Sequence, residues 1–276
     1  MIRGISCSSV AVRRPDGTIA LRVDPIDRIF TGVLRGVILI RGVVALLETL
    51  VLGMKSLMYS ANVAAGEIGE EISKSALIAV LSLSFTFGVC LFFVLPVLAS
   101  IFFENITQSS VVGNITEGVI RLAVFFAYLL LIGKMRQINR VFMYHGAEHM
   151  TVHAQENCDA LEVGSIRSYP TAHPRCGTAF LLTVLIVASI VFSFIDRDVL
   201  WVLVLSRLVL IPPIAAISYE LIRFGGFNLE NPIVKLVTMP SLVIQSLTTR
   251  QPSDDQIEIA ITAMEAAIKY DSCQAT

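Results

Sequence analysis

The stretch ALIAVLSLSFTFGVCLFFVLPVLASIFF, residues 76–103, decides the fold. It contains no charged side chain and is longer than the roughly 20 residues that a helix needs to cross a bilayer. Pro96 predicts a kink near its far end. The whole chain of 276 residues is 55% hydrophobic and only 16% charged, with a mean hydropathy of +0.74, whereas soluble domains carry about 25% charged residues. These values predict an integral membrane protein with the lipid bilayer as its partner.

Three further apolar stretches are predicted to span the membrane, at residues 115–132, 178–195 and 199–222. Only Asp196, Arg197 and Asp198 separate the last two, so these are expected to form an antiparallel hairpin. The predicted fold class is therefore an all-α integral membrane protein with about four transmembrane helices, cytoplasmic amphipathic helices and a small N-terminal β-hairpin.

The distribution of Lys and Arg predicts the orientation. The loop between the first two spans, 104–117, contains neither residue, whereas the loop after the second span carries five: Lys134, Arg136, Arg140, Arg167 and Arg175. Both terminal segments are also rich in Lys and Arg. Because such residues accumulate on the cytoplasmic side, both termini and the 134–177 loop are expected there. Arg121, close to the outer end of the second span, carries no functional expectation. The formal net charge of −1 gives no reason to expect a nucleic-acid partner.

The segments outside the spans have patterns of their own. Residues 8–23 alternate apolar and polar around Pro15-Asp16-Gly17, which predicts a hairpin. Charges interrupt the apolar residues 32–60 and leave pieces too short to span, which favours an amphipathic interfacial helix or a re-entrant pair. Ser253 and Gln256 have capping-box spacing, and the apolar stripe that follows predicts an amphipathic helix docked on the protein. These patterns divide the chain into six predicted segments. They are an N-terminal cytoplasmic hairpin (1–31), amphipathic or re-entrant helices (32–75), a transmembrane hairpin (76–133), a cytoplasmic His/Cys loop (134–177), a second transmembrane hairpin (178–222) and a cytoplasmic tail (223–276).

Three of the four histidines lie within YHGAEHMTVHAQE, residues 144–156. Residues four apart on a helix differ by ~6 Å along the axis and ~40° in rotation, so His145 and His149 can bind one ion. His-x-x-Glu-His is the inverted zinc-protease motif, in which Glu148 is the candidate general base. His153, one turn further on, is expected to be exposed or to support a ligand residue, since three ligands at this spacing meet one ion only if the helix bends. The alternative is a solvated helix that happens to carry imidazoles.

The fourth histidine strengthens the metal hypothesis. His173 and Cys176, with two residues between them, occupy a Pro- and Gly-containing turn that can present two ligands to one ion. The predicted ligands are His145, His149, His173 and Cys176, and imidazole with thiolate favours Zn²⁺ over Mg²⁺ or Ca²⁺. Four protein ligands make a closed, structural site, whereas three leave a position open for catalysis, and the sequence leaves both possible. Glu220 is a possible outer-shell carboxylate.

Several segments together resemble one family of bacterial membrane proteins, the DUF1385 family typified by YqhQ. They are VAVRRPDG (10–17), RGVVALLETLVLGMKSLMYSA (41–61), YHGAEH (144–149), HPRCGTAFLL (173–182), ISYELIR (217–223) and LTTRQPSDDQIEIAI (247–261). The resemblance implies a multi-pass protein of the bacterial cytoplasmic (inner) membrane that has been described as a predicted metal-dependent enzyme, with no established substrate. Members usually carry a glycine-rich stretch ahead of the segment that matches Met1–Gly4, so the expectation is either that the true start lies upstream or that this stretch has been lost.

The leading functional prediction is a membrane protein with a cytoplasmic-facing His/Glu/Cys site for a divalent metal, acting as a hydrolase. One alternative is a scaffold or assembly factor with a structural metal, which binds protein partners or a second copy of itself. A third is a transporter, indicated by Arg207 and Glu220 within the fourth span, where charges are costly.

Overall fold

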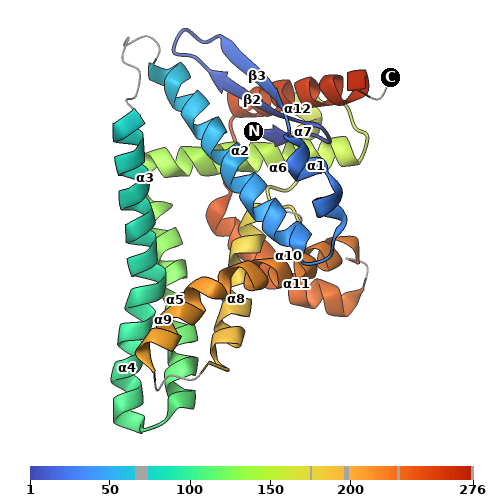
Figure 1. Cartoon of the computed structure of the whole chain (residues 1–276). Helices are drawn as coiled ribbons and strands as arrows, with labels where there is room; N and C mark the ends of the chain where they lie inside the picture. Colours follow the sequence, from blue (N-terminus) through green and yellow to red (C-terminus); the bar gives the residue numbers. More distant parts are fainter. Residues whose placement is uncertain (66–73, 175, 196–198, 229–230, 275–276) are drawn as a thin grey trace.

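The computed structural model describes residues 1–65, 74–174, 176–195, 199–228 and 231–274. Its elements form two regions (Figure 1): a small sheet lies with α6 and α12 at one end, and the long apolar helices extend away from them. Arg175 and the predicted turn at 196–198 lie outside the described residues.

The N-terminal residues form a three-stranded antiparallel sheet in the order β1-β2-β3, made of Ile2–Arg3, Cys7–Arg13 and Ile19–Pro25. The predicted hairpin is confirmed: β2 pairs with β3, and Gly17 in the turn has φ +87°, a conformation that suits glycine. The short strand β1 was not predicted.

Helix α12, Asp254–Gln274, confirms the predicted C-terminal helix. Ser253 donates its backbone N–H to Oε1 of Gln256 at 3.0 Å, which is half of a capping box. Ile257 and Met264 are buried, because the helix packs between α6 (Arg136–Glu156) and the sheet. The helix therefore docks on the protein, as its apolar stripe predicted.

Residues 28–65 form α1 (Arg28–Thr31), a 3-10 turn (Val33–Gly36) and the single helix α2 (Ile40–Ala65). The sequence suggested that charges divide this region into pieces too short to span, yet α2 is continuous and long and apolar enough to cross a membrane. Glu48, one of the three charged residues of this helix, is buried and paired with Arg3 and Arg35. Pairing within the chain thus accommodates one of the charges that the sequence suggested as interruptions.

The segment that decides the fold forms α3 (Lys74–Val89), a π-helical turn (Cys90–Val94) and α4 (Leu95–Thr107), and α5 (Ser110–Ile132) returns alongside. Pro96 has no N–H to donate to the carbonyl of Phe92, four residues earlier, and Arg121 of α5 donates to that carbonyl instead, at 3.1 Å. The sequence suggested no particular role for Arg121 near the end of its span. That interpretation was wrong, because the side chain is 1% exposed and contacts other parts of the bundle.

Arg121 belongs to a buried charged cluster with Glu117 of α5 and Arg207 of α9 (Leu200–Val209). Both arginines bind the Glu117 carboxylate, Arg207 with two hydrogen bonds of 2.9 and 2.8 Å. Arg207 therefore pairs with a carboxylate across the bundle, which explains how a charge is accommodated in an apolar helix.

The last two predicted spans differ from the structure. Helix α8, Gly177–Phe192, has 16 residues, fewer than the roughly 20 that a span needs. The predicted fourth span is broken into α9 and α10 (Ile211–Phe227), which meet at 42° next to Pro212 and Pro213. A further apolar helix, α11 (Pro232–Thr248), follows, and α7 (Val163–Ile166) lies between α6 and α8.

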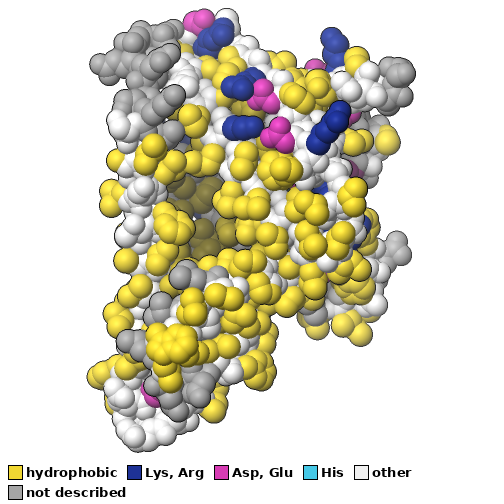
Figure 2. Space-filling view, in the orientation of Figure 1, with side chains coloured by type: hydrophobic (Ala, Val, Ile, Leu, Met, Phe, Trp, Pro, Cys, Tyr) yellow, Lys and Arg dark blue, Asp and Glu magenta, His cyan; other side chains and the backbone are white. Residues whose placement is uncertain are grey.

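Among the described residues, three helices are long and apolar enough to cross a membrane, or four if the bent pair counts as one. Figure 2 shows most charged side chains of this view at the end that carries the sheet, and hydrophobic side chains over the helices below. The structure is therefore compatible with a membrane protein, and α2 replaces α8 among the long candidate spans.

Candidate metal centre

Helix α6 presents two different faces. Ala147, Met150 and Ala154 are fully buried against α12, which fixes the helix rotation. The other face, with His145, His149, His153 and Glu156, is turned toward the loop between α7 and α8. Packing of the apolar face thus directs a stripe of ligand side chains at His173 and Cys176 of that loop.

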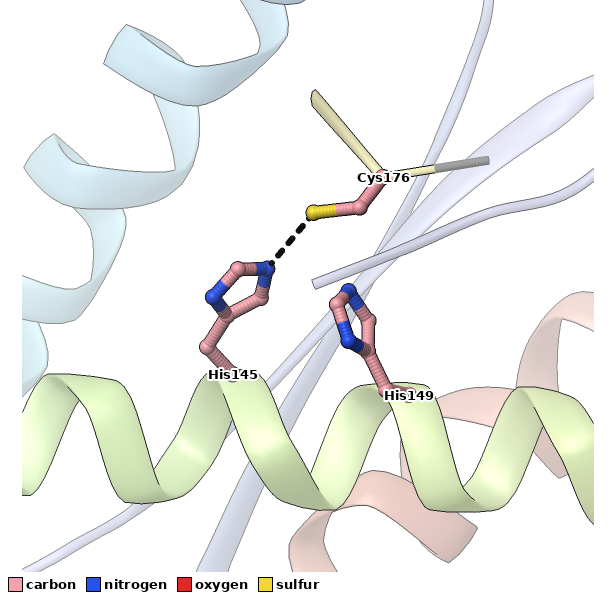
Figure 3. Close-up of side chains that lie close together, drawn as sticks. All are labelled: His145, His149 and Cys176. Carbon is pink, nitrogen blue, oxygen red and sulfur yellow. Dashed lines mark hydrogen bonds between the residues drawn. The ribbon is translucent and has the colours of Figure 1, made fainter. Parts of the chain in front are cut away.

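The first group consists of His145, His149 and Cys176, here named the thiolate site. One ligand atom from each lies within 4.8 Å of the others. Nε2 of His145 is 3.2 Å from Sγ of Cys176, and the two imidazole centroids are 4.3 Å apart. Figure 3 shows both imidazoles rising from α6 toward the thiol, which directly precedes α8. Imidazole and thiolate are ligand types that Zn²⁺ prefers, and the three groups lie at a separation that one ion can bridge.

Backbone carbonyls orient both imidazoles. Nδ1 of His145 donates to the carbonyl of Thr248 at 2.9 Å, and Nδ1 of His149 donates to the carbonyl of Thr171 at 2.6 Å. Since a carbonyl only accepts, the proton must be on Nδ1 in each ring. Nε2 is therefore left to bind an ion, which is the arrangement found around metal-ligating histidines.

Cys176 and His145 form a pair of opposite charges at the thiolate site. Burial would raise the pKa of the Cys176 thiol, but the imidazoles of His145 and His149 outweigh it and lower the pKa from 9.0 to about 5. Burial likewise lowers the pKa of His145, but the contact with Cys176 outweighs it, and the pKa rises to about 9. A proton on His145 thus compensates the thiolate charge that a divalent cation would compensate when bound.

A second group consists of His153, Glu156 and His173, here named the carboxylate site. Its ligand atoms also lie within 4.8 Å of one another, and Nε2 of His173 is 3.2 Å from Oε2 of Glu156. Burial lowers the pKa of His173 more than the Glu156 hydrogen bond raises it, which favours the neutral imidazole. His173, predicted to complete the first set, is thus placed beside His153 and Glu156.

The remaining predicted residues lie elsewhere. Glu148 is on another face of α6, with its carboxylate 3.6 Å from the α-amino group of Met1. Glu220 binds Arg41 of α2, so the structure does not bring it to the histidines. Glu156 was missed, although its spacing of 11 residues from His145, about three helical turns, places it on the same stripe.

Gly146 allows the end of α11 to approach the thiolate site. A Cβ at this position would lie 2.2 Å from the carbonyl oxygen of Arg250, and the backbone N–H of Arg250 donates to the carbonyl of Phe142 at 3.0 Å. This close contact positions the segment containing Thr248, whose carbonyl orients His145.

Comparison with known proteins places the chain in a family. A family model described as "Protein of unknown function (DUF1385)" matches residues 37–270. The chain belongs to the DUF1385 family. The uncharacterized protein YqhQ of Bacillus subtilis (strain 168) is 28% identical, over 95% of this chain and 87% of the relative. No solved structure matches. The DUF1385 match contains all six candidate ligand residues of the two sites, but its description assigns no activity to them.

Proposed function

We propose that this DUF1385 protein is an integral membrane protein that binds Zn²⁺ at the thiolate site and acts as a metal-dependent hydrolase. The observation that carries the proposal is the convergence of three ligand atoms whose imidazoles are each locked by a backbone carbonyl. A solvated helix with incidental histidines would not need carbonyl partners for both Nδ1 atoms, nor a buried thiol between the rings.

Three protein ligands leave one coordination position for water or substrate. An ion held in this way supplies Lewis-acid chemistry at that position. The chain supplies the orientation: Thr248 and Thr171 hold the imidazoles, and burial of Cys176 excludes bulk solvent. The general-base role predicted for Glu148 requires its carboxylate to leave the amino group of Met1 and turn toward the site.

The predicted membrane orientation, with both termini and α6 in the cytoplasm, is part of the proposal. It is supported by the Lys and Arg distribution and by the charged end in Figure 2. Cys158 is exposed just after α6, so an impermeant thiol reagent should label it in inverted vesicles but not in intact cells. Labelling from outside intact cells would reverse the orientation.

Metal analysis of the purified full-length protein tests the zinc site. We expect at least one equivalent of Zn²⁺ in the wild type, one equivalent fewer in Cys176→Ser, and the wild-type content in the matched control Cys158→Ser. Glu148→Gln should keep the metal while abolishing hydrolysis, because the proposal makes Glu148 a base and not a ligand. Loss of metal in Glu148→Gln would contradict that role, and a wild type without Zn²⁺ would contradict the site itself.

One observation favours a structural role as the second candidate. The thiolate site joins α6 to the start of α8, and its carbonyl contact joins α6 to the end of α11, so an ion there would fasten three elements of a membrane scaffold that binds protein partners or a second copy. Azide added to Co²⁺-loaded protein separates the two: an open site changes its visible spectrum, whereas a closed site does not. A transporter is less supported, since Arg207 and Glu220 are both paired within the chain.

A further inference from the structure

The carboxylate site has the features of a ligand set and not only of a surface ion pair. His173 is 5% exposed and His153 is half-buried, while the Glu156 carboxylate, 35% exposed, closes the group on its solvent side. Two imidazoles and one carboxylate form the set that binds zinc in several hydrolases and iron in oxygenases. The group is therefore enclosed on one side and accessible on the other, as an exchangeable metal requires.

Hydrogen bonds also orient this second set. Nε2 of His153 donates to the carbonyl of Ala172 at 2.9 Å, which leaves Nδ1 with its lone pair free to bind an ion. The ring of Tyr169 stacks on His153 with an interplanar angle of 6°. His153 is thus fixed in rotation by a carbonyl on its edge and a ring on its face.

Helix α11 positions His173. The buried side chain of Gln245 accepts from the backbone N–H of His173 at 2.8 Å and donates to the carbonyl of the same residue at 3.0 Å. Two hydrogen bonds to one residue hold the loop in register with α6. This register sets His173 opposite His153, with ring centroids 4.6 Å apart.

The two sites are neighbours that share no ligand. The ring of His173 is 5.8 Å from that of His149, and the ligands on α6 follow one another at intervals of four, four and three residues. We propose that His153, Glu156 and His173 bind a second divalent first-row metal ion next to the thiolate site, so that the protein holds a two-metal centre. The proposal goes beyond the zinc site, because each ligand set stands without the other.

Cobalt titration of the metal-free full-length protein in detergent distinguishes the sites. Thiolate ligation gives Co²⁺ an intense near-ultraviolet charge-transfer band, whereas a set of two imidazoles and a carboxylate gives only weak visible bands. We expect two equivalents of Co²⁺ in the wild type. Cys176→Ser should keep one equivalent and lose the charge-transfer band, and Glu156→Gln should keep one equivalent together with that band.

Glu162→Gln is the matched control, because Glu162 is an exposed carboxylate just beyond α6, and it should bind two equivalents. His153→Asn gives a second measurement if Glu156→Gln fails to fold. A wild type that binds one equivalent with the charge-transfer band, unchanged in Glu156→Gln, would overturn the second site and leave the first. One equivalent without that band, lost in Glu156→Gln, would support the second site and overturn the first.

Discussion

The charged cluster of Glu117, Arg121 and Arg207 and the thiolate site both bury polar groups, but they satisfy them differently. In the charged cluster, opposite charges meet: Glu117 accepts from both arginines, and the ring of Phe192 lies against their guanidinium groups at 5.2 and 4.2 Å. One carboxylate is shared by two guanidinium groups, and the Phe92 carbonyl and the Phe192 ring interact with the positive charge that it leaves. The partners of this cluster are therefore supplied by the chain itself, as a buried structural ion pair requires.

In the thiolate site, by contrast, groups that can each donate an electron pair to a metal ion lie close together. The hydrogen bonds of His145 and His149 engage Nδ1 and leave Nε2 of each ring near Sγ of Cys176. A proton on His145 compensates the thiolate only in part of the pH range, between the two pKa values of about 5 and about 9. The difference suggests a rule for this molecule: polar groups that compensate each other hold the fold, whereas converging lone pairs form a binding site.

The reactivity of Cys176 gives the largest expected effect. Because its pKa is lowered to about 5, the thiolate exists above that pH and is lost below it. Alkylation of Cys176 in metal-free protein should therefore reach half its maximal rate near pH 5, measured by peptide mass spectrometry, and Zn²⁺ should block it. Burial, with help from Asp271, raises the pKa of Cys7 to about 11, so Cys7 is the internal control and should stay unmodified at neutral pH. If the alkylation rate of Cys176 instead reached half its maximum near pH 9, the thiol would have its ordinary pKa, and the thiolate site would hold no separated charges.

Glu117→Gln breaks the other side of the comparison. It leaves two buried guanidinium groups without their shared carboxylate, which should cost about 3–5 kcal/mol of unfolding free energy and lower the Tm by at least about 6 °C. The measurement is thermal unfolding in detergent, with Glu265→Gln, an exposed carboxylate of α12, as the matched control. Equal melting of the two variants would show that the charged cluster contributes no more than a surface group.

Gly146→Ala tests whether the segment after α11 holds the thiolate site in place. The new Cβ would meet the Arg250 carbonyl at 2.2 Å, and such overpacking costs about 1–3 kcal/mol. Displacement of the adjacent Thr248 carbonyl should weaken Zn²⁺ binding about 10–100-fold, measured by competition with a chelator. Gly53→Ala in α2, where a Cβ meets nothing within 4 Å, should leave the Kd unchanged. An unchanged Kd in Gly146→Ala would mean that the carbonyl does not orient His145.

Local patterns in the sequence predicted those parts of the structure that depend on local geometry. The hairpin around Gly17, the helix after Ser253 and the pairing of His145 with His149 all follow from periodicity or turn chemistry within a few residues. Local chemistry also explains one partner of Arg121. Pro96 leaves the Phe92 carbonyl without its helical donor, and Arg121 supplies the missing hydrogen bond.

Long-range contacts decided the rest. Which turn of α6 receives His173 depends on Gln245, 72 residues away, and no spacing within the 134–177 loop encodes that choice. In the same way, Glu48 appears in the sequence as an interruption of an apolar stretch, but in the structure it is buried in α2 and pairs with Arg35 and with Arg3, 45 residues earlier. Side chains whose partners lie far along the chain were therefore the ones that the sequence misplaced.

Glu220→Gln should have the smallest effect and sharpens the comparison between carboxylates. Glu220 binds Arg41 as Glu117 binds Arg207, but the two side chains are 23% and 16% exposed, against 2% and 5% for the buried pair. Water can replace a lost partner at the exposed pair, so Tm should fall less than in Glu117→Gln. Both Co²⁺ equivalents should remain, because the contacts of Glu220 are with α2 and not with a ligand residue. Loss of either equivalent would instead restore the outer-shell role that the sequence predicted for Glu220, and would mean that the junction of α2 and α10 supports the metal centre.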